Sequence, residues 1–210
     1  MKLYDMVLAP NPRRVRIFLA EKGIEVPCEQ VDIPSGANLS ADFLAVNPRG
    51  VVPTLVLDDR SVIDESIAIC RYFEALHPDP PLFGTTPIEQ ANIESWQRQC
   101  EFDGLFAVAG VFRNRSPNFA NRAMPGNAPA LPQSSELAAR GEVLTAHFFD
   151  RLEMRLAASP FVGGGAYSVA DITAMVVIDF AKWVRIRVPE ANAATLAWYA
   201  AVSARPSAKA

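Results

Sequence analysis

The chain has 210 residues, half of them apolar and one fifth charged, with a formal net charge of −3. This length allows one large domain or two small ones, and the composition is that of an ordinary globular protein. The charge balance argues against nucleic acid as a partner, and no apolar run approaches the roughly 20 residues that span a bilayer. Because the chain starts directly with a strand pattern and shows no secretory segment, we expect a cytoplasmic protein without a membrane partner.

The cysteines and histidines predict neither a redox site nor a metal site. Cys28, Cys70 and Cys100 are widely spaced and form no Cys-x-x-Cys pair, so each is expected to be a small buried apolar residue. His77 and His147 are too few and too far apart to indicate metal ligands, and we expect no metal.

The first 76 residues alternate between strand and helix patterns. Strands are expected over 2–7, 26–31, 54–57 and 61–63, and helices over 12–22, 40–46 and 65–76. The first helix has clear ends, because Asn11 is an N-cap type, Pro12 suits the first helical position and Gly23 suits the C-terminal end. The order β-α-β-α-β-β-α predicts a small thioredoxin-like α/β domain over residues 1–80.

A proline-rich linker separates this domain from a helical one. Four prolines fall within the eleven residues 77–87, which indicates a stiff, turn-rich connection. An all-α domain is expected over 87–210, with helices over 88–112, 137–156, from 168 onward and over 191–203. Ser168 and Asp171 are typical of a capping box that opens a buried helix. The segment 116–133 is rich in Pro, Asn and Ala and is expected to form a loop.

Two short segments of the first domain are candidates for a binding site. Val52-Pro53 stands directly before a strand; a cis bond there would turn the main-chain groups of Val52 outward, to pair with an extended peptide. A trans proline at a strand edge is the structural alternative. Glu65 and Ser66 open a helix, where the acid suits an ammonium group and the hydroxyl, with the helix N-terminus, suits a carboxylate. Simple helix capping would also account for this pair.

Two stretches of the first domain resemble the glutathione-binding half of the cytosolic glutathione S-transferases. They are Leu44-Ala-Val-Asn-Pro-Arg-Gly-Val-Val-Pro-Thr-Leu-Val-Leu57 and Asp64-Glu-Ser-Ile-Ala-Ile-Cys-Arg-Tyr-Phe-Glu-Ala-Leu76. The resemblance covers nearly the whole chain and is weakest over 100–135. It implies the glutathione transferase fold and a symmetric homodimer. It also implies that Val52 and a cis Pro53 hold the cysteinyl backbone of glutathione, and that Glu65 and Ser66 hold its γ-glutamyl end.

The same resemblance implies that a thiol-activating residue follows the first strand. Family members use Tyr, Ser or Cys there, whereas Ala9 stands next to the expected glutathione site where many members have Ser or Thr. Asn11 is similar to the active-site Asn of a bacterial subgroup that includes disulfide-bond reductases. As N-cap, its oxygen would accept a main-chain N–H, leaving the NH₂ to donate to the thiolate, and Arg13 and Arg14 would add positive potential. A capping role alone is the alternative.

Three further residues complete the implied glutathione site. Family members often have a Lys before the cis proline to hold the glycine carboxylate; Val51 takes its place, so Arg49 or Asn38 is the candidate, with a surface role as the alternative for each. Asp103 is expected either to reach the glutathione ammonium of the partner subunit or to be a solvated or N-capping acid. Candidates for lining the electrophile pocket of the second domain are Phe106, Phe112, Phe119 and Met124.

Three functions are consistent with these residues. The first is a transferase that conjugates glutathione to an electrophilic small molecule. The second is a glutathione-dependent disulfide reductase or peroxidase, favoured by Ala9 and Asn11. The third is a non-catalytic binding protein that keeps the fold; the missing Ser, Tyr and Lys favour it, and the intact Glu65-Ser66 pair counts against it.

Overall fold

A four-stranded mixed sheet organises the N-terminal part of the chain, and the computed structural model describes residues 1–210. The strands are β1 (Lys2–Asp5), β2 (Cys28–Gln30), β3 (Thr54–Val56) and β4 (Val62–Asp64), in the order β2-β1-β3-β4. β1 runs parallel to β2 and antiparallel to β3, with Leu3 opposite both Cys28 and Leu55. β4 pairs antiparallel with β3.

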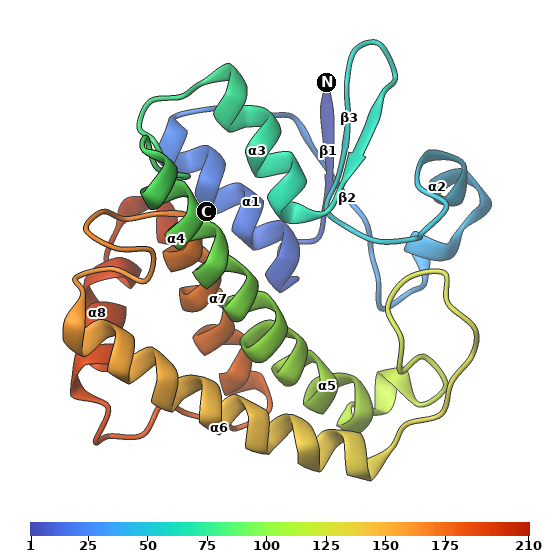
Figure 1. Cartoon of the computed structure of the whole chain (residues 1–210). Coiled ribbons are helices and arrows are strands. Elements are labelled where there is room, and N and C mark those ends of the chain that lie inside the picture. Colours follow the sequence, from blue (N-terminus) through green and yellow to red (C-terminus); the bar gives the residue numbers. More distant parts are fainter.

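Three helices complete this α/β part, and their order confirms the predicted fold. They are α1 (Pro10–Lys22), α2 (Ala41–Val46) and α3 (Ser66–Leu76). α1 and α3 lie side by side on one face of the sheet, and α2 lies on the other side (Figure 1). Gly23 ends α1 as predicted, with a left-handed φ of 65° that glycine adopts readily.

The predicted start of α1 was wrong. The helix begins at Pro10, so the N-cap is Ala9, which has no capping side chain, and Asn11 lies inside the first turn. Pro10 and Pro12 both lack an N–H, and neither loses a hydrogen bond in the first turn, where the N–H groups have no intrahelical acceptor. A proline at either position is therefore compatible with a helix start.

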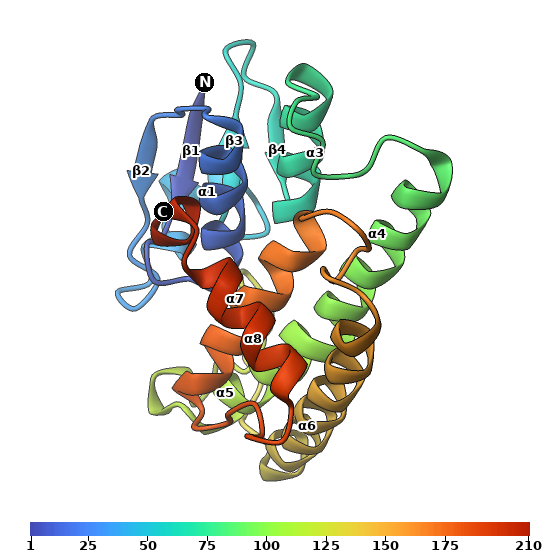
Figure 2. The same ribbon diagram turned by 90° about the vertical axis from the view of Figure 1, so that its left-hand side faces the viewer.

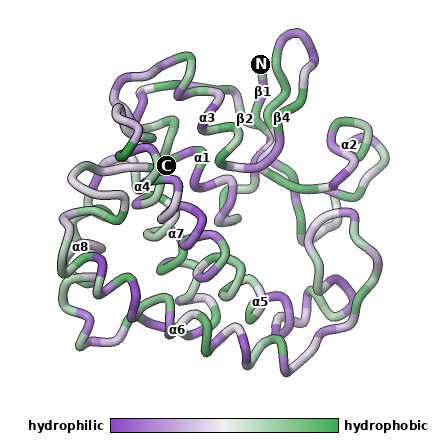
Figure 3. Tube along the Cα trace, viewed as in Figure 1, coloured by the Kyte–Doolittle hydropathy of each residue, from purple (hydrophilic) through white to green (hydrophobic).

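The C-terminal part is helical and surrounds one buried helix. The elements are α4 (Pro87–Gln99), a π-helical segment (Cys100–Leu105), α5 (Phe106–Arg115), α6 (Ser135–Ala158), α7 (Val169–Trp183) and α8 (Ala193–Ser203). The first three form one continuous rod, because the backbone stays helical at both junctions. The hydropathy colours alternate along α6, as expected for a helix with one buried face (Figure 3). No helix is long and apolar enough to cross a membrane.

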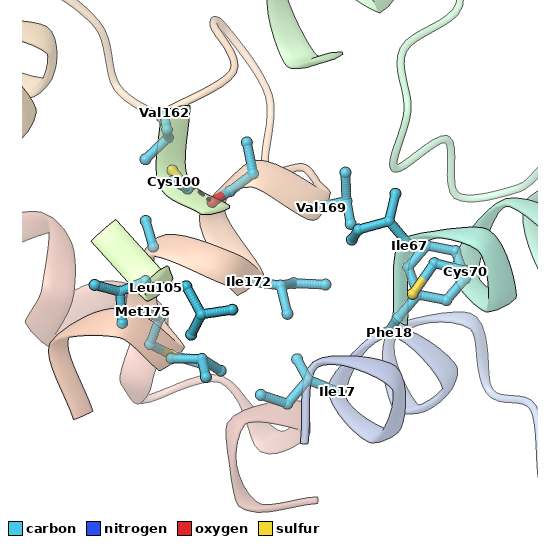
Figure 4. Close-up of a cluster of buried hydrophobic side chains, with 14 of the residues drawn as sticks. Ile17, Phe18, Ile67, Cys70, Cys100, Leu105, Val162, Val169, Ile172 and Met175 are labelled. Carbon is cyan, nitrogen blue, oxygen red and sulfur yellow. Dashed lines mark hydrogen bonds between the residues drawn. The ribbon is translucent and has the colours of Figure 1, made fainter. Parts of the chain in front are cut away.

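The two parts share one apolar core. A single cluster of 34 buried residues includes Leu3 and Phe18 from the α/β part and Phe148 and Ile172 from the helical part. In the close-up, Ile17, Phe18 and Ile67 lie on the α1 and α3 side of this cluster, across from the α7 side chains of Ile172 and Met175 (Figure 4). The start of α7 therefore packs against the α1–α3 layer, while residues 77–86 connect α3 to α4 without regular structure (Figure 2).

Asp171 anchors the start of α7 from a fully buried position. Its carboxylate accepts hydrogen bonds from the Ser168 N–H and hydroxyl at 3.0 and 2.9 Å. It also accepts from the N–H of Val162 at 2.8 Å and from the indole of Trp198 at 2.9 Å. The predicted capping box is confirmed, and its role is structural.

The cysteines differ in their surroundings. Cys70 and Cys100 are buried as predicted, and burial raises the pKa of Cys70 to about 12. Cys28 is exposed, so the prediction was wrong for it. It lies on β2, an edge strand whose three residues all face solvent. With raised pKa values, all three thiols are poor candidates for a nucleophile.

Candidate functional site

The N-terminal ends of α1 and α3 meet, which brings together two predicted site residues that are 55 positions apart. The Ser66 hydroxyl donates to the main-chain oxygen of Asn11 at 3.0 Å, and Ser66 is only 1% exposed. The N–H groups of the first turn of α3 have no partner within the helix and carry partial positive charge. In the first turn of α1 only Asn11 adds such a group, because Pro10 and Pro12 lack an N–H. This corner therefore suits a negatively charged group.

The amide of Asn11 is held in one orientation by a side-chain partner. Its Oδ1 accepts a hydrogen bond from Nη2 of Arg14 at 3.0 Å, rather than from a main-chain N–H as the capping hypothesis predicted. The Nδ2 group makes no hydrogen bond within the protein, and Asn11 is half-buried. The amide can therefore donate two hydrogens to a ligand.

The two arginines after Asn11 are neutralised by carboxylates of the helical part. Nη1 of Arg14 lies 2.8 Å from Glu101, and Nη1 of Arg13 lies 2.7 Å from Asp179. The expectation that both would add positive potential at the site is corrected accordingly, because each charge is paired. Their contribution is to hold neighbouring groups in place.

The Val52-Pro53 peptide bond is cis, as the resemblance implied. Neither the N–H nor the C=O of Val52 is hydrogen-bonded within the protein. The turn before it is held by Asn47, which donates to Thr54 Oγ1 at 2.8 Å, while Thr54 donates to the Val51 carbonyl at 2.8 Å. An unpaired donor and acceptor on one residue can take an extended peptide as an added strand.

Glu65 sits before α3 with an uncommon backbone conformation. Its φ is 70° and its ψ is 125°, a region that residues other than glycine rarely adopt. Its exposed carboxylate lies 2.6 Å from Nη2 of Arg49, whose Nη1 lies 2.8 Å from Asp64. The hydrogen bond to Glu65, followed by that to Asp64, raises the pKa of Arg49. Strained backbone in a structure points to a functional constraint, here on the position of the carboxylate.

Asn38, Asp103 and Ala9 differ in their burial and in their contacts. Asn38 is buried and its amide donates to the Gly50 carbonyl at 2.8 Å, so it braces the turn from inside. Its contact with the glycine carboxylate of glutathione stays a prediction. Asp103 is partly exposed and paired with Arg151 of α6 at 2.6 Å. Ala9 lies at the start of α1, next to the same corner.

The 116–133 loop docks on the turn that precedes the cis proline. The N–H of Asn127 donates to the Arg49 carbonyl at 2.7 Å, and its side chain donates to the Pro48 carbonyl at 3.3 Å. A Cβ on Gly126 would lie 2.2 Å from the Arg49 oxygen. Figure 1 shows the loop, in yellow and green, beside the segment around α2. Composition predicted a loop but gave no sign of this contact.

A small pocket lies next to the corner, between the two parts of the chain. Its lining residues are Leu8, Pro10, Arg13, Val176, Asp179, Phe180 and Trp183. None of the four predicted lining residues is among them. Phe112 packs behind the pocket, with ring centroids 5.4 Å from Phe180 and 5.8 Å from Trp183. The sequence signal for this pocket was weak, because the α7 sequence is mostly apolar and indicates a core helix. The apolar Leu8 in a turn was the one available indication.

Comparisons with known proteins agree with this architecture. Residues 9–76 match the family model described as Glutathione S-transferase, N-terminal domain. The chain is 35% identical to Glutathione S-transferase 2 of Saccharomyces cerevisiae, covering 100% of this chain and 88% of the relative. It is 32% identical to Glutathione S-transferase 3 of Zea mays, covering 99% and 90%.

Solved structures give the same result over the whole length. The crystal structure of Gtt2 from Saccharomyces cerevisiae matches with a TM-score of 0.91 at 34% identity, covering 100% of this chain and 99% of that chain. A glutathione S-transferase domain-containing protein of Marinobacter aquaeolei matches with a TM-score of 0.90 at 34% identity, covering 99% of both chains. The α/β part with its cis proline, the helical part and the full-length similarity together show that this chain belongs to the glutathione S-transferase family.

Proposed function

We propose that this protein is a glutathione S-transferase that joins the glutathione sulfur to an electrophilic carbon of a small molecule. The observation that carries the proposal is the free NH₂ of Asn11 at the meeting point of two helix N-termini. The thiol releases its proton to solvent, and Asn11 donates a hydrogen bond to the resulting thiolate. The sulfur then forms a bond to the electrophilic carbon, and a leaving group departs with its electron pair.

The remaining contacts of glutathione are assigned from the groups that are free to make them. The unpaired main chain of Val52, before Pro53, pairs with the cysteinyl backbone. Glu65 holds the γ-glutamyl ammonium. The unpaired main-chain N–H groups of the first turn of α3, starting at Ser66, hold the γ-glutamyl carboxylate, while the Ser66 hydroxyl stays bonded to the Asn11 carbonyl. Arg49, already beside Glu65, faces this same end of glutathione rather than the glycine carboxylate. Ala9 leaves space for the ligand.

The second substrate is proposed to be an apolar electrophile with an aromatic face. Leu8, Phe180 and Trp183 supply the apolar walls of the small pocket, and Leu8 and Trp183 are largely exposed. The protein contributes orientation and thiolate stabilisation.

A symmetric homodimer is proposed as the assembly, in the cytoplasm. Its support is the pair of exposed rings of Phe102 and Phe106 on the α4–α5 rod, which stack with centroids 6.1 Å apart. Asp103, between them, is then placed near the partner subunit. Sedimentation equilibrium is expected to give twice the chain mass, and Phe102→Glu with Phe106→Glu is expected to give monomers.

The test of function is an ultraviolet titration with glutathione at neutral pH, alongside glutathione disulfide and S-methylglutathione. A transferase gives a thiolate band with glutathione, weak disulfide binding and turnover of an aryl halide. Tight disulfide binding with disulfide reduction would replace the proposal by a reductase or peroxidase. S-methylglutathione measures binding without a thiolate, and no binding of any of the three would leave a non-catalytic member of the family.

Asn11→Ala is expected to weaken thiolate formation while binding of S-methylglutathione survives. A hydrogen bond to a charged group contributes about 1.5 to 3 kcal/mol, so the pKa of the bound thiol should rise by about one to two units. The pH dependence of the thiolate band measures this shift. An unchanged pKa would transfer the role to the helix N-termini alone.

A further inference from the structure

Arg14 is a buried charge placed between the two parts of the chain and directly behind Asn11. It lies on α1, is 2% exposed, and its guanidinium contacts three side chains. Nη2 donates to Asn11 Oδ1 at 3.0 Å, and Nη1 donates to Glu101 at 2.8 Å and to Thr173 Oγ1 at 3.4 Å. Asn11 shares the helix with Arg14, whereas Glu101 and Thr173 belong to the helical part.

The hydrogen bond from Arg14 to Asn11 Oδ1 fixes the orientation of the Asn11 amide. An Asn side chain has one acceptor oxygen and one donor nitrogen on opposite sides of the same carbon. Arg14 has donors only, so it accepts no contact from the amide nitrogen and selects the rotamer with Oδ1 inward. The NH₂ group is thereby directed away from Arg14, and it is left free to donate to a ligand.

The guanidinium is itself held from the helical part. Glu101 is mostly buried and also contacts Arg98 at 3.1 Å, and Thr173 donates onward to Gln97 Oε1 at 2.9 Å. Gln97 and Thr173 are fully buried. A planar guanidinium that bonds two groups at fixed angles is a more rigid support than an ammonium group on a flexible chain.

Stability alone gives a weak account of this arrangement. A buried ion pair often contributes no more than apolar residues of the same size, and Nε of Arg14 is buried without any partner. The charge of Arg14 is also neutralised by Glu101, so its direct electrostatic effect on a nearby sulfur is small. What remains specific to Arg14 is the bond to Asn11.

We propose that Arg14 is a positioning residue for the transfer reaction, which holds the Asn11 amide with its NH₂ toward the glutathione sulfur and ties that amide to the helical part through Glu101. The inference rests on the proposed role of Asn11. Arg14 touches neither glutathione nor the electrophile, and it acts through the side chain of Asn11.

A double-mutant cycle on the full-length protein tests this role. The variants are Asn11→Ala, Arg14→Met and the two combined, and the measured quantity is the pKa of bound glutathione from its thiolate band. Arg14→Met is expected to lower the ionisation constant of bound glutathione about tenfold in the presence of Asn11, as for loss of one charge-assisted hydrogen bond. In the Asn11→Ala background the same change should have less than about a twofold effect.

Two further variants separate positioning from charge and from folding. Arg14→Lys keeps the charge but cannot bond Asn11 and Glu101 at once through two fixed nitrogens. The pKa of bound glutathione should therefore stay as high as in Arg14→Met. Arg205→Met is the matched control, because Arg205 also links α1 to the helical part, through Glu21 at 2.6 Å, far from Asn11. It should leave the pKa of bound glutathione unchanged. If the Arg14 variants do not fold, Glu101→Leu removes the outer support and should raise that pKa only when Asn11 is present.

The outcomes distinguish this inference from the proposed function. Equal effects of Arg14→Met with and without Asn11, or full restoration by Arg14→Lys, would overturn the positioning role while leaving the transferase intact. A wild-type protein that binds glutathione but forms no thiolate would instead remove the proposed function itself. An Asn11→Ala variant with an unchanged pKa would remove the basis for both residues but not the transfer activity.

Discussion

Under the proposed assignment, the pair of Glu65 and Arg49 receives the γ-glutamyl end of glutathione. The two exposed side chains already neutralise each other across 2.6 Å. The ligand end carries one ammonium and one carboxylate, so it can satisfy both charges without leaving either one unpaired. The backbone φ of 70° at Glu65 is strained for a residue with a side chain, which indicates a functional constraint on the position of the Glu65 carboxylate.

At this scale we expect Glu65→Gln to weaken glutathione binding about tenfold or more, because a charge-assisted hydrogen bond contributes about 1.5 to 3 kcal/mol. Turnover at saturating glutathione should change little, since the lost contact is the same in ground and transition states. Calorimetry with glutathione and with its analogue lacking the amino group measures the effect. The analogue should bind equally to both proteins; a similar loss for the analogue would contradict the assignment. Asp64→Asn, which also contacts Arg49, serves as the control and should have a smaller effect.

At the scale of elements, the 116–133 loop links α5 and α6 to the turn before the cis proline. Arg113 of α5 holds the loop by donating to the carbonyls of Arg122 and Met124, at 3.0 and 3.1 Å. Burial lowers the pKa of Arg113 to about 10, so the guanidinium stays charged at neutral pH. The middle of the loop is thus held twice, at residues 122 and 124 by α5 and at residue 127 by the 48–51 turn.

Gly126→Ala is expected to detach the loop from this turn. The new Cβ would clash with the Arg49 carbonyl, and the φ of 70° at this position adds about 1 kcal/mol of strain for a residue with a side chain. Because Val52 follows the turn directly, affinity for S-methylglutathione should fall about three- to tenfold, with a modest loss of thermal stability. Gly110→Ala is the control: it lies in α5 with no atom near its Cβ, and should leave binding unchanged. Equal affinity for both variants would show that the loop does not support the turn.

Elements were predictable from the sequence because their signals are local. Gly23, the Ser168–Asp171 box and the apolar periodicity each act within a few residues, and the fold followed from their order. The start of α1 was missed by two residues because two prolines both fit the first turn. The partner of Asn11 was attributed to the main chain, and the support by Glu101 depends on packing between residues 87 positions apart. No local pattern carries such a contact.

At the scale of the whole molecule, the continuous core means that the α/β part and the helical part stabilise each other. Polar contacts also join the two parts. Glu21 of α1 is mostly buried and forms an ion pair, at 2.6 Å, with Arg205, which follows α8 in the chain. Desolvation, the largest single effect, acts to raise the pKa of Glu21. Hydrogen bonds from Arg205 and Ser207 outweigh it and leave the pKa below its ordinary value of 4.5.

This lowered pKa predicts a pH-dependent contribution to folding. An acid whose pKa is lower in the folded state stabilises the fold above its unfolded pKa, and that contribution is lost as the pH falls through the folded pKa. Glu21→Gln should therefore lower the free energy of unfolding at neutral pH, and the difference from wild type should shrink below pH 4.5. Denaturant unfolding at several pH values measures this difference in the free energy of unfolding, and we expect one cooperative transition. Glu142→Gln breaks an exposed pair with Arg115 and should have little effect at any pH. A Glu21→Gln deficit that did not depend on pH would refute the linkage.

The hydrogen bonds from the loop to the 48–51 turn go to main-chain carbonyls, those of Pro48 and Arg49, and none goes to a side chain of the turn. Hydrogen bonds to main-chain carbonyls do not depend on the side chain at position 49. The ion pairs of Arg49 lie at the surface, where an ion pair contributes little to the free energy of unfolding. Position 49 can therefore change in evolution without loosening the frame around it. Under the proposed assignment of Arg49 to glutathione, the support of the turn and the contact with the ligand are made by different groups. A change at position 49 can then alter the preference for one end of the thiol peptide without altering the support.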